Sequence, residues 1–133
     1  MHYFLAEMRP NALCVFDVNL CPDCCAAEVI GESLRFADIV KLNNEEVPKV
    51  MDLVSLQHSC DESSAFRLLD NFGLKMLFLT RGSEGSMLVD AASRATEHRG
   101  YPAPVADTIG AGDAFTAMMM DRYLRGATPE EIR

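Results

Sequence analysis

Short apolar runs recur along the chain, each bounded by polar or turn-forming residues. Residues 12–18, 37–42 and 75–80 are runs of this kind and are rich in strand-forming side chains, which is typical of strands buried on both faces of a sheet. After the third run, residues 81–85 (RGSEG) have the composition of a turn, and residues 86–89 resume the apolar pattern. This spacing predicts a β-hairpin closed by a loop of about five residues.

Amphipathic stretches separate these runs. Residues 24–36 carry apolar positions on one helical face and follow Asp23, a candidate N-terminal cap. A second helix is predicted over residues 61–72, because Gly73 behind it is suited to a left-handed C-cap. Strands that alternate with helices predict an α/β fold in which helices cover both faces of a parallel sheet.

The last part of the chain is less regular. Residues 96–105 have a weak pattern interrupted by two prolines, and no element is predicted there. Residues 114–125 predict a helix that ends before Gly126 and is apolar at Phe115, Met118, Met119 and Leu124. We expect the three consecutive methionines, Met118 to Met120, to pack in a core.

Composition limits the classes of protein that need to be considered. The chain has 133 residues, 49% of them hydrophobic and 24% charged, as expected for one folded domain. Twelve basic and twenty acidic residues give a net charge of −8, which disfavours nucleic-acid and anionic-membrane partners. With neither a membrane-spanning stretch nor a secretory signal in the pattern, we expect a cytoplasmic protein.

The five cysteines form no paired framework, so reduced thiols are expected. Cys21 and Cys24 have the C-x-x-C spacing of a redox pair between a strand and a helix, and a thiol redox module is therefore one alternative function. A zinc site that used Cys21, Cys24 and Cys25 would lack a second C-x-x-C pair.

The end of the chain contains a strong helix start. Thr128, Pro129 and Glu131 provide a cap, a first-position proline and the acidic member of a capping box, but only two residues follow Glu131. Because so short a helix is marginal without packing, we expect the chain to be a fragment of a longer protein.

The most informative motif is the segment DTIGAGDAF, residues 107–115. Gly110 and Gly112 allow a sharp turn in front of a helix, where outward-pointing N–H groups and the helix dipole form an anion cradle. Asp113 beside such a cradle is suited to accept a proton from an attacking hydroxyl, which favours phosphoryl transfer to an alcohol. A tight turn with an acidic residue that stabilises the helix end is the alternative interpretation.

Other phosphate-binding motifs do not match. The chain has no G-x-x-x-x-G-K-[ST] sequence, which excludes a P-loop on motif grounds. In a dinucleotide fingerprint the third glycine position would hold Phe115, and Asp113 would repel a pyrophosphate.

Four segments together resemble the ribokinase-like, or PfkB, family of carbohydrate kinases. The D-T-I-G-A-G-D run at residues 107–113 resembles the family's C-terminal signature. Asp17-Val18-Asn19 resembles its D-x-N strand end, residues 41–46 (KLNNEE) its N-x-x-E element, and residues 80–85 (TRGSEG) its T-x-G-x-x-G nucleotide loop. The resemblance runs from about residue 12 to the end of the chain and corresponds to the middle and later part of a family member. It implies a three-layer, mostly parallel ribokinase-like sheet, here truncated.

The resemblance also implies roles for individual residues. Asp113 would be the catalytic base, with an anion hole formed by Gly110, Ala111 and Gly112. Asn43 and Glu46 would organise Mg²⁺ through its waters, although their spacing also fits a helix capping box. The nucleotide site would include Thr80, Gly82 and Gly85, although the same residues also fit a plain hairpin turn. A monovalent cation such as K⁺ would bind near Asp107 and the carbonyl of Ile109.

The activity implied is transfer of the ATP γ-phosphate to a hydroxymethyl group of a sugar, with fructose the leading candidate. We expect sugar and ATP as partners and a homo-oligomer. The chain departs from the family at Val18, where proline is frequent, and at Cys21, where an arginine is frequent. The sugar-binding and lid segments of the family's first half, and its final segment, have no counterpart. A non-catalytic, self-associating remnant that binds nucleotide weakly is therefore a second alternative.

Overall fold

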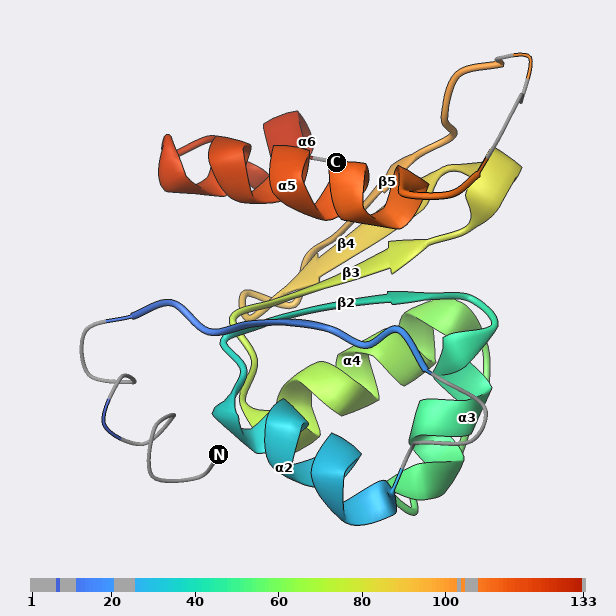
Figure 1. Ribbon diagram of the computed structural model, residues 1–133, viewed down its shortest axis with the longest axis vertical. Coiled ribbons are helices and arrows are strands. Elements are labelled where there is room, and N and C mark those ends of the chain that lie inside the picture. Colours follow the sequence, from blue (N-terminus) through green and yellow to red (C-terminus); the bar gives the residue numbers. More distant parts are fainter. Residues whose placement is uncertain (1–6, 8–11, 21–25, 103, 105–107, 133) are drawn as a thin grey trace.

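A mixed five-stranded sheet organises the molecule (Figure 1). The computed structural model describes residues 7, 12–20, 26–102, 104 and 108–132 of the chain. The strands follow the same order in space as in the chain: β1 (Val15–Asp17), β2 (Ile39–Asn43), β3 (Met76–Thr80), β4 (Ser86–Asp90) and β5 (Ala95–His98). β1, β2 and β3 are parallel, whereas β4 and β5 are antiparallel to their neighbours. The prediction of a parallel sheet therefore holds for the first three strands only, because the loops after β3 and β4 are too short for a parallel crossover.

Helices cover both faces of the sheet, which confirms the α/β class. The helices α2 (Ala27–Phe36), α3 (Glu46–Leu53) and α4 (Asp61–Phe72) lie on one face in Figure 1, and α5 (Ala111–Leu124) and α6 (Pro129–Ile132) lie on the other. A short 3₁₀ turn, η1 (Gly82–Glu84), occupies the predicted hairpin loop between β3 and β4. None of the helices in the described ranges is long and apolar enough to cross a lipid bilayer.

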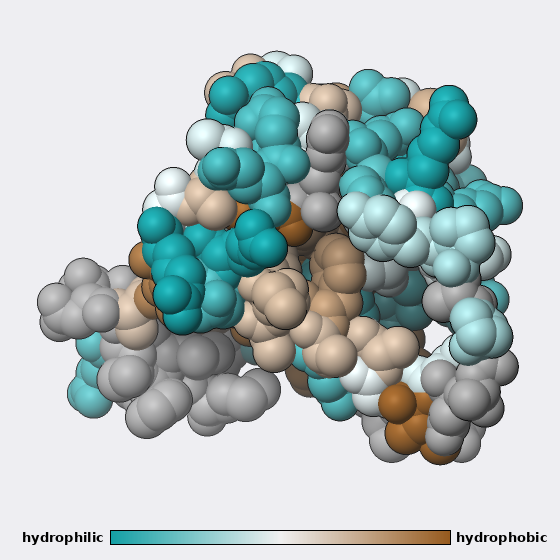
Figure 2. Space-filling view, turned by 90° about the horizontal axis from the view of Figure 1, so that it is seen from above, coloured by the Kyte–Doolittle hydropathy of each residue, from teal (hydrophilic) through white to brown (hydrophobic). Residues whose placement is uncertain are grey.

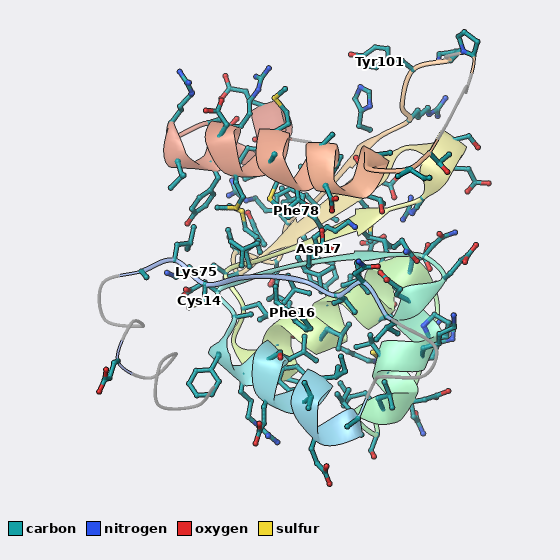
Figure 3. The ribbon with its side chains drawn as sticks, in the orientation of Figure 1. Cys14, Phe16, Asp17, Lys75, Phe78 and Tyr101 are labelled. Atoms are coloured by element: carbon teal, nitrogen blue, oxygen red, sulfur yellow. The ribbon has the colours of Figure 1, made fainter. Side chains whose placement is uncertain are left out.

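The alternation of side chains along each strand separates two cores. In β3, Leu77 and Leu79 pack into the cluster beneath α2–α4, while Phe78 packs into the cluster that contains Met119 and Ile132. All of these strand positions are buried, which explains the unbroken apolar run in the sequence. In Figure 3, Asp17 and Phe78 lie between the sheet and α5, whereas Phe16 points toward the other layer.

Two predicted helix starts were wrong, and one strand was missed. The first helix begins at Ala27 rather than at residue 24, since its N-cap Ala26 is extended; Asp23, the predicted cap, lies outside the described residues. α5 begins at Ala111 rather than at residue 114, which places Asp113 in its first turn. β5 was not predicted, because its side chains at the edge of the sheet alternate only between exposed and half-buried.

The methionine prediction holds for Met119 but is wrong for Met118. Met119 is buried between α5 and the sheet, whereas Met118 is 59% exposed and Leu124 is 71% exposed. Apolar residues occur around the whole circumference of α5, so their spacing did not define the buried face.

Both predicted capping boxes are present, as is the left-handed C-cap at Gly73 (φ 65°). Thr128 N–H donates to Glu131 Oε2 (2.8 Å), and Ile132 from the same short helix packs against Met119. Tertiary packing therefore stabilises the four-residue helix α6, which would be marginal alone.

Candidate functional site

Polar residues line up across the sheet where the parallel strands end. The register pairs Asn43 with Thr80, Thr80 with Ser86, and Ser86 with His98. Their position in the alternation is that of Phe78 and Leu88, which face α5. In open α/β sheets, ligands bind in the crevice beyond the carboxyl ends of the strands, and this row borders that crevice.

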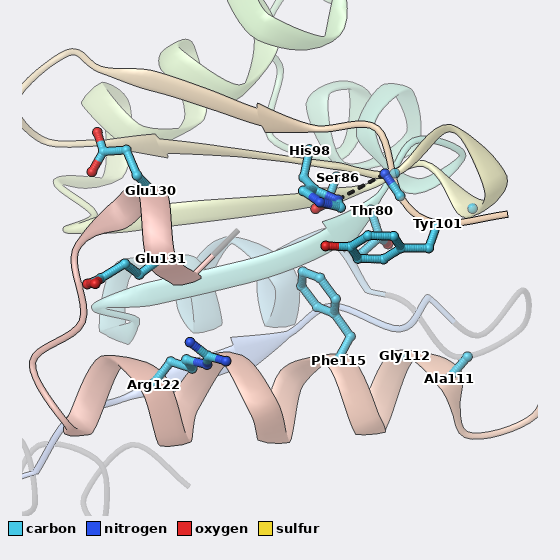
Figure 4. Close-up of a pocket in the computed structure, with 13 residues that line it drawn as sticks. Thr80, Ser86, His98, Tyr101, Ala111, Gly112, Phe115, Arg122, Glu130 and Glu131 are labelled. Carbon is cyan, nitrogen blue, oxygen red and sulfur yellow. Dashed lines mark hydrogen bonds between the residues drawn. The ribbon is translucent and has the colours of Figure 1, made fainter. Parts of the chain in front are cut away.

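A cavity of about 800 Å³ opens between this row and α5 (Figure 4). It is lined by five of the residues singled out in the sequence: Thr80, Gly82, Gly85, Ala111 and Gly112. The nucleotide-loop motif and the glycine turn, separated by 25 residues and more along the chain, therefore share one cavity. The volume is within the usual range for small-molecule sites. Figure 2 views the molecule from the side of α5, where hydrophilic side chains flank a band of more apolar surface.

The loop between β3 and β4 needs a glycine at position 85, because the loop passes close to the backbone of residues 98–100. Gly85 has a φ of 92°, and a Cβ there would collide with the backbone oxygen of His98. Arg81 holds the loop from outside, with Nη1 2.9 Å from Glu97 Oε1 in β5 and Nε 3.3 Å from Asp61 Oδ2 in α4. The loop is consequently packed against the segment that follows β5.

The glycine turn leads directly into α5. Gly110 is the N-cap of the helix with a left-handed φ of 77°. The first N–H group of the turn, on Ala111, donates to Thr108 O (3.1 Å), and the helical bonds start where Ala114 N–H donates to Gly110 O (2.9 Å). The N–H groups of Gly112 and Asp113 thus lie in the first turn, where a helix has no acceptors of its own. This arrangement is a site for an anion.

Asp113 is exposed in the first turn of α5. Among the described residues, its carboxylate has no hydrogen-bond or ion-pair partner. It is adjacent to Ala111 and Gly112, which line the cavity, but does not line the cavity itself. Its carboxylate is therefore free to accept a hydrogen bond from a ligand beside the turn.

Asn43 and Glu46 form the reciprocal capping arrangement. Asn43 Oδ1 accepts from the N–H groups of Glu45 and Glu46 (both 3.0 Å), and Glu46 Oε2 accepts from Asn43 N–H (2.8 Å). Glu46 Oε1 accepts from Leu20 N–H (3.0 Å), and the residue is only 6% exposed. Asn43 Oδ1 accepts two hydrogen bonds, which use both of its lone pairs. Glu46 Oε1 and Oε2 accept one hydrogen bond each, so the Glu46 carboxylate keeps acceptor capacity toward a hydrated cation.

Only some of the residues predicted to bind a monovalent cation or a metal lie within the described part of the chain. Asp107 lies outside the described residues, as do Cys21, Cys24 and Cys25. Ile109, just before the glycine turn, is 90% exposed. Within the described ranges, no three His, Cys, Asp or Glu side chains form a group that could hold a metal ion.

Several residues of the cavity had no predicted role. His98 Nδ1 accepts from Gly100 N–H (2.9 Å), and its ring centroid is 4.9 Å from that of Tyr101. Phe115 packs edge-on against Phe78, with ring centroids 6.3 Å apart. The sequence predicted Phe115 only as an apolar helix position, and His98 and Tyr101 fall in the stretch where no element was predicted, so only the folded arrangement brings these rings to one cavity.

Charged residues lie at the end of the cavity formed by α5 and α6. Arg122, Glu130 and Glu131 line it there (Figure 4). The hydrogen bond from Thr128 N–H lowers the pKa of the Glu131 carboxyl. This carboxylate caps α6 and remains charged at neutral pH.

Comparison with known proteins gives a consistent result. The sequence model of the pfkB family of carbohydrate kinases matches residues 4–132. A 5-dehydro-2-deoxygluconokinase from Clostridium beijerinckii is 27% identical over 90 residues, which are 68% of this chain and 26% of that protein. A fructokinase from Salmonella thompson is 28% identical over 123 residues, which are 88% of this chain and 52% of the relative.

Solved structures show the same fold. The crystal structure of a fructokinase with bound ATP from Xylella fastidiosa superposes with a TM-score of 0.76 at 22% identity, covering 93% of this chain and 40% of that one. The chain therefore spans about half, or less, of the length of these relatives.

Proposed function

This chain belongs to the pfkB family of carbohydrate kinases, and from that premise we propose that it forms the nucleotide-binding and catalytic-base part of an ATP-dependent sugar kinase. The observation that carries the proposal is the shared cavity, which combines the loop of Thr80, Gly82 and Gly85 with the turn of Ala111 and Gly112. Asp113 follows that turn directly.

The cavity suits a nucleoside triphosphate. It is polar at the glycine turn, where first-turn N–H groups favour phosphate oxygens. It carries the rings of His98, Tyr101 and Phe115 along its wall, which offer apolar surface to a base or ribose. The Xylella relative with bound ATP supports this assignment of the ligand class.

In the proposed reaction, Asp113 accepts the proton of a sugar hydroxyl as that oxygen attacks the γ-phosphorus in line. The bond from the γ-phosphorus to the β–γ bridging oxygen breaks on the opposite side, and ADP leaves. The N–H groups of Gly110 and Gly112 would hold the charge that develops on the transferred phosphoryl oxygens, and a preorganised donor of this kind contributes about 3 kcal/mol. The N–H of Ala111 donates to Thr108 O (3.1 Å), so it would join them only when that bond opens. Glu46 would hold Mg²⁺ through its waters, with Asn43 fixing the backbone beside it, and the cation would neutralise phosphate charge.

The finer assignments follow from the resemblance. We propose that the acceptor is a hydroxymethyl group of a sugar and that fructose is the leading candidate. The fructokinase matches 88% of this chain, whereas the 5-dehydro-2-deoxygluconokinase matches 68%. Another relative is a 5-dehydro-2-deoxygluconokinase, so the assay tests more than one acceptor. We further propose a K⁺ site formed by Asp107 and the carbonyl of Ile109, and a homo-oligomer.

The test combines binding with turnover. Titration calorimetry of this chain with ATP should show one site per chain, and an ADP-release assay with fructose, ribose and adenosine should identify the acceptor. ATP binding with turnover on a sugar supports the proposal. Absence of ATP binding refutes it.

One observation favours a second candidate, a remnant that binds nucleotide but does not turn over. The chain covers only 26–52% of the two curated relatives, and exposed Met118 and Leu124 provide apolar surface for self-association. ATP binding without ADP release by the chain alone, together with turnover when its reading frame is extended, would identify this case.

A further inference from the structure

Lys41 is a charged residue enclosed in the middle of the sheet. It belongs to β2, is 6% exposed, and lies between the buried residues Val40 and Leu42. Its Nζ is 3.1 Å from Asp17 Oδ1 in the neighbouring strand β1, and the two residues are direct partners in the parallel register. An ammonium group is costly to bury unless it is paired, so the position of this charge requires an explanation.

The same carboxylate reaches α5. Thr116 Oγ1 is 2.8 Å from Asp17 Oδ2 and 3.0 Å from the carbonyl oxygen of Gly112. Asp17 therefore lies between the Lys41 ammonium and the first turns of the helix, and it connects both to the end of β1. Figure 3 shows Asp17 in this layer between sheet and helix.

Lys41 approaches the glycine turn closely. A Cβ built on Gly112 would be 3.2 Å from Lys41 Nζ. The ammonium thus lies beside Gly112 in the glycine turn; Gly112 lines the cavity, and Lys41 is immediately behind that lining. In a chain of net charge −8, such a local cation offsets the repulsion that a polyanionic ligand would meet.

We propose that Lys41 is a phosphate-binding residue of the nucleotide site, with its ammonium held under the turn of residues 110–112 by Asp17. The inference rests on the proposed function and adds a specific contact to it. Asp17 and Thr116 act as positioning residues, because they fix the ammonium and the helix start relative to each other. An ammonium and a phosphate attract strongly in a partly buried site.

A purely structural ion pair is the competing explanation, and it makes a different prediction. If Lys41 only anchored α5, its loss would disturb the whole cavity and would weaken every ligand alike. If it binds phosphate, its loss weakens ligands in proportion to their phosphate charge. The two cases are separated by measuring the affinities for ATP, for inorganic tripolyphosphate, which has only the phosphates, and for adenosine, which has none.

The variant is Lys41→Met, which keeps the length of the side chain and removes the charge. The matched control is Lys75→Met, because Lys75 Nζ also pairs with an aspartate, Asp38 (3.0 Å), at the opposite end of the sheet. By calorimetry, Lys41→Met should weaken ATP and tripolyphosphate about tenfold or more and leave adenosine within about twofold. Lys75→Met should change none of the three. Unchanged ATP affinity in Lys41→Met, or equal losses for ATP and adenosine, overturns the proposal.

A second measurement on the unmodified chain covers the case in which Lys41→Met does not fold. With ¹⁵N-labelled lysine, the ammonium signal of Lys41 should shift on addition of ATP or tripolyphosphate and stay in place with adenosine. A signal that ATP does not move overturns the inference while leaving the proposed function intact. A wild-type chain that binds no ATP overturns both.

Discussion

Asp113 combines an exposed side chain with a position at the start of a helix, beside Ala111 and Gly112, which line the cavity. A general base needs access to the proton that it removes, and within the described residues no side chain pairs with this carboxylate. This exposure is consistent with the proposed role of Asp113 as the base.

We predict that Asp113→Asn, in the form of the enzyme that turns over, lowers kcat about 10²-fold to 10⁴-fold, because the amide cannot accept the hydroxyl proton. ATP affinity should remain close to that of the wild type. ADP release and calorimetry measure the two quantities. The control is Asp121→Asn on the same helix, where the carboxylate pairs with Arg125. Unchanged turnover in Asp113→Asn would remove this residue from the mechanism.

Gly85 is a second residue whose role depends on backbone geometry. We expect Gly85→Ala to lower stability by several kcal/mol, because it combines a left-handed backbone with a collision against His98, and to abolish ATP binding. Gly126→Ala is the control, since it has a φ of 77° and no atom within 4 Å of the added Cβ. Thermal unfolding should show the larger loss for Gly85→Ala; equal losses would contradict the steric argument.

The β4–β5 hairpin shows how a single element is stabilised. Asp90 at the end of β4 accepts N–H bonds from Ala92 (2.9 Å) and Arg94 (3.1 Å), and its side chain is 5% exposed. Burial raises the pKa of the Asp90 carboxyl, but the hydrogen bonds from Arg94 and Ala92 outweigh burial and lower the pKa below its ordinary value.

Because the folded-state pKa is lowered, this carboxylate stabilises the fold above the ordinary carboxyl pKa, and the contribution is lost as pH falls through the lowered value. We predict that Asp90→Asn costs about 1–3 kcal/mol of unfolding free energy at pH 7. The difference from the wild type should shrink below pH 4, which urea unfolding at a series of pH values measures. Asp70→Asn, an exposed position in α4, should show little effect. A difference that is constant with pH would contradict the assignment.

Elements with strong local signals were predicted well. The buried strand β3 and the helix α4 with its glycine cap coincide with their predictions almost residue for residue. The strand β5 was not predicted, because an edge strand needs only one half-buried side and so shows a weak apolar pattern. The start of α5 was predicted three residues too late, because it depends on the left-handed Gly110 rather than on apolar spacing.

At the scale of the whole molecule, we expect the excess of acidic residues to oppose association at neutral pH. The net charge of −8 at pH 7 and an isoelectric point near 4.7 predict mutual repulsion at neutral pH and aggregation near pH 4.7, where that repulsion vanishes. Dynamic light scattering across this range measures the particle size. A size that does not grow toward pH 4.7 would show that surface charge does not control association.

The whole molecule also explains which residues of the candidate site could be predicted. Gly112, Thr80 and Gly82, which line the cavity, and Asp113 beside it each belong to a short sequence motif, so local sequence was enough to single them out. Lys41 and Thr116 were not assigned a role, because their significance arises from Asp17, which is 24 residues from Lys41 and 99 from Thr116.

Local order in the chain was enough to specify the buried strands, the capped helices and the glycine turn, since each depends on interactions between residues a few positions apart. Only strand pairing and helix packing brought the β3–β4 loop and the start of α5 to one cavity and placed the buried Lys41 beside Gly112. The physical reason is that contacts between distant segments depend on how complete sheets and helices pack against each other, and no local pattern of side chains encodes that packing.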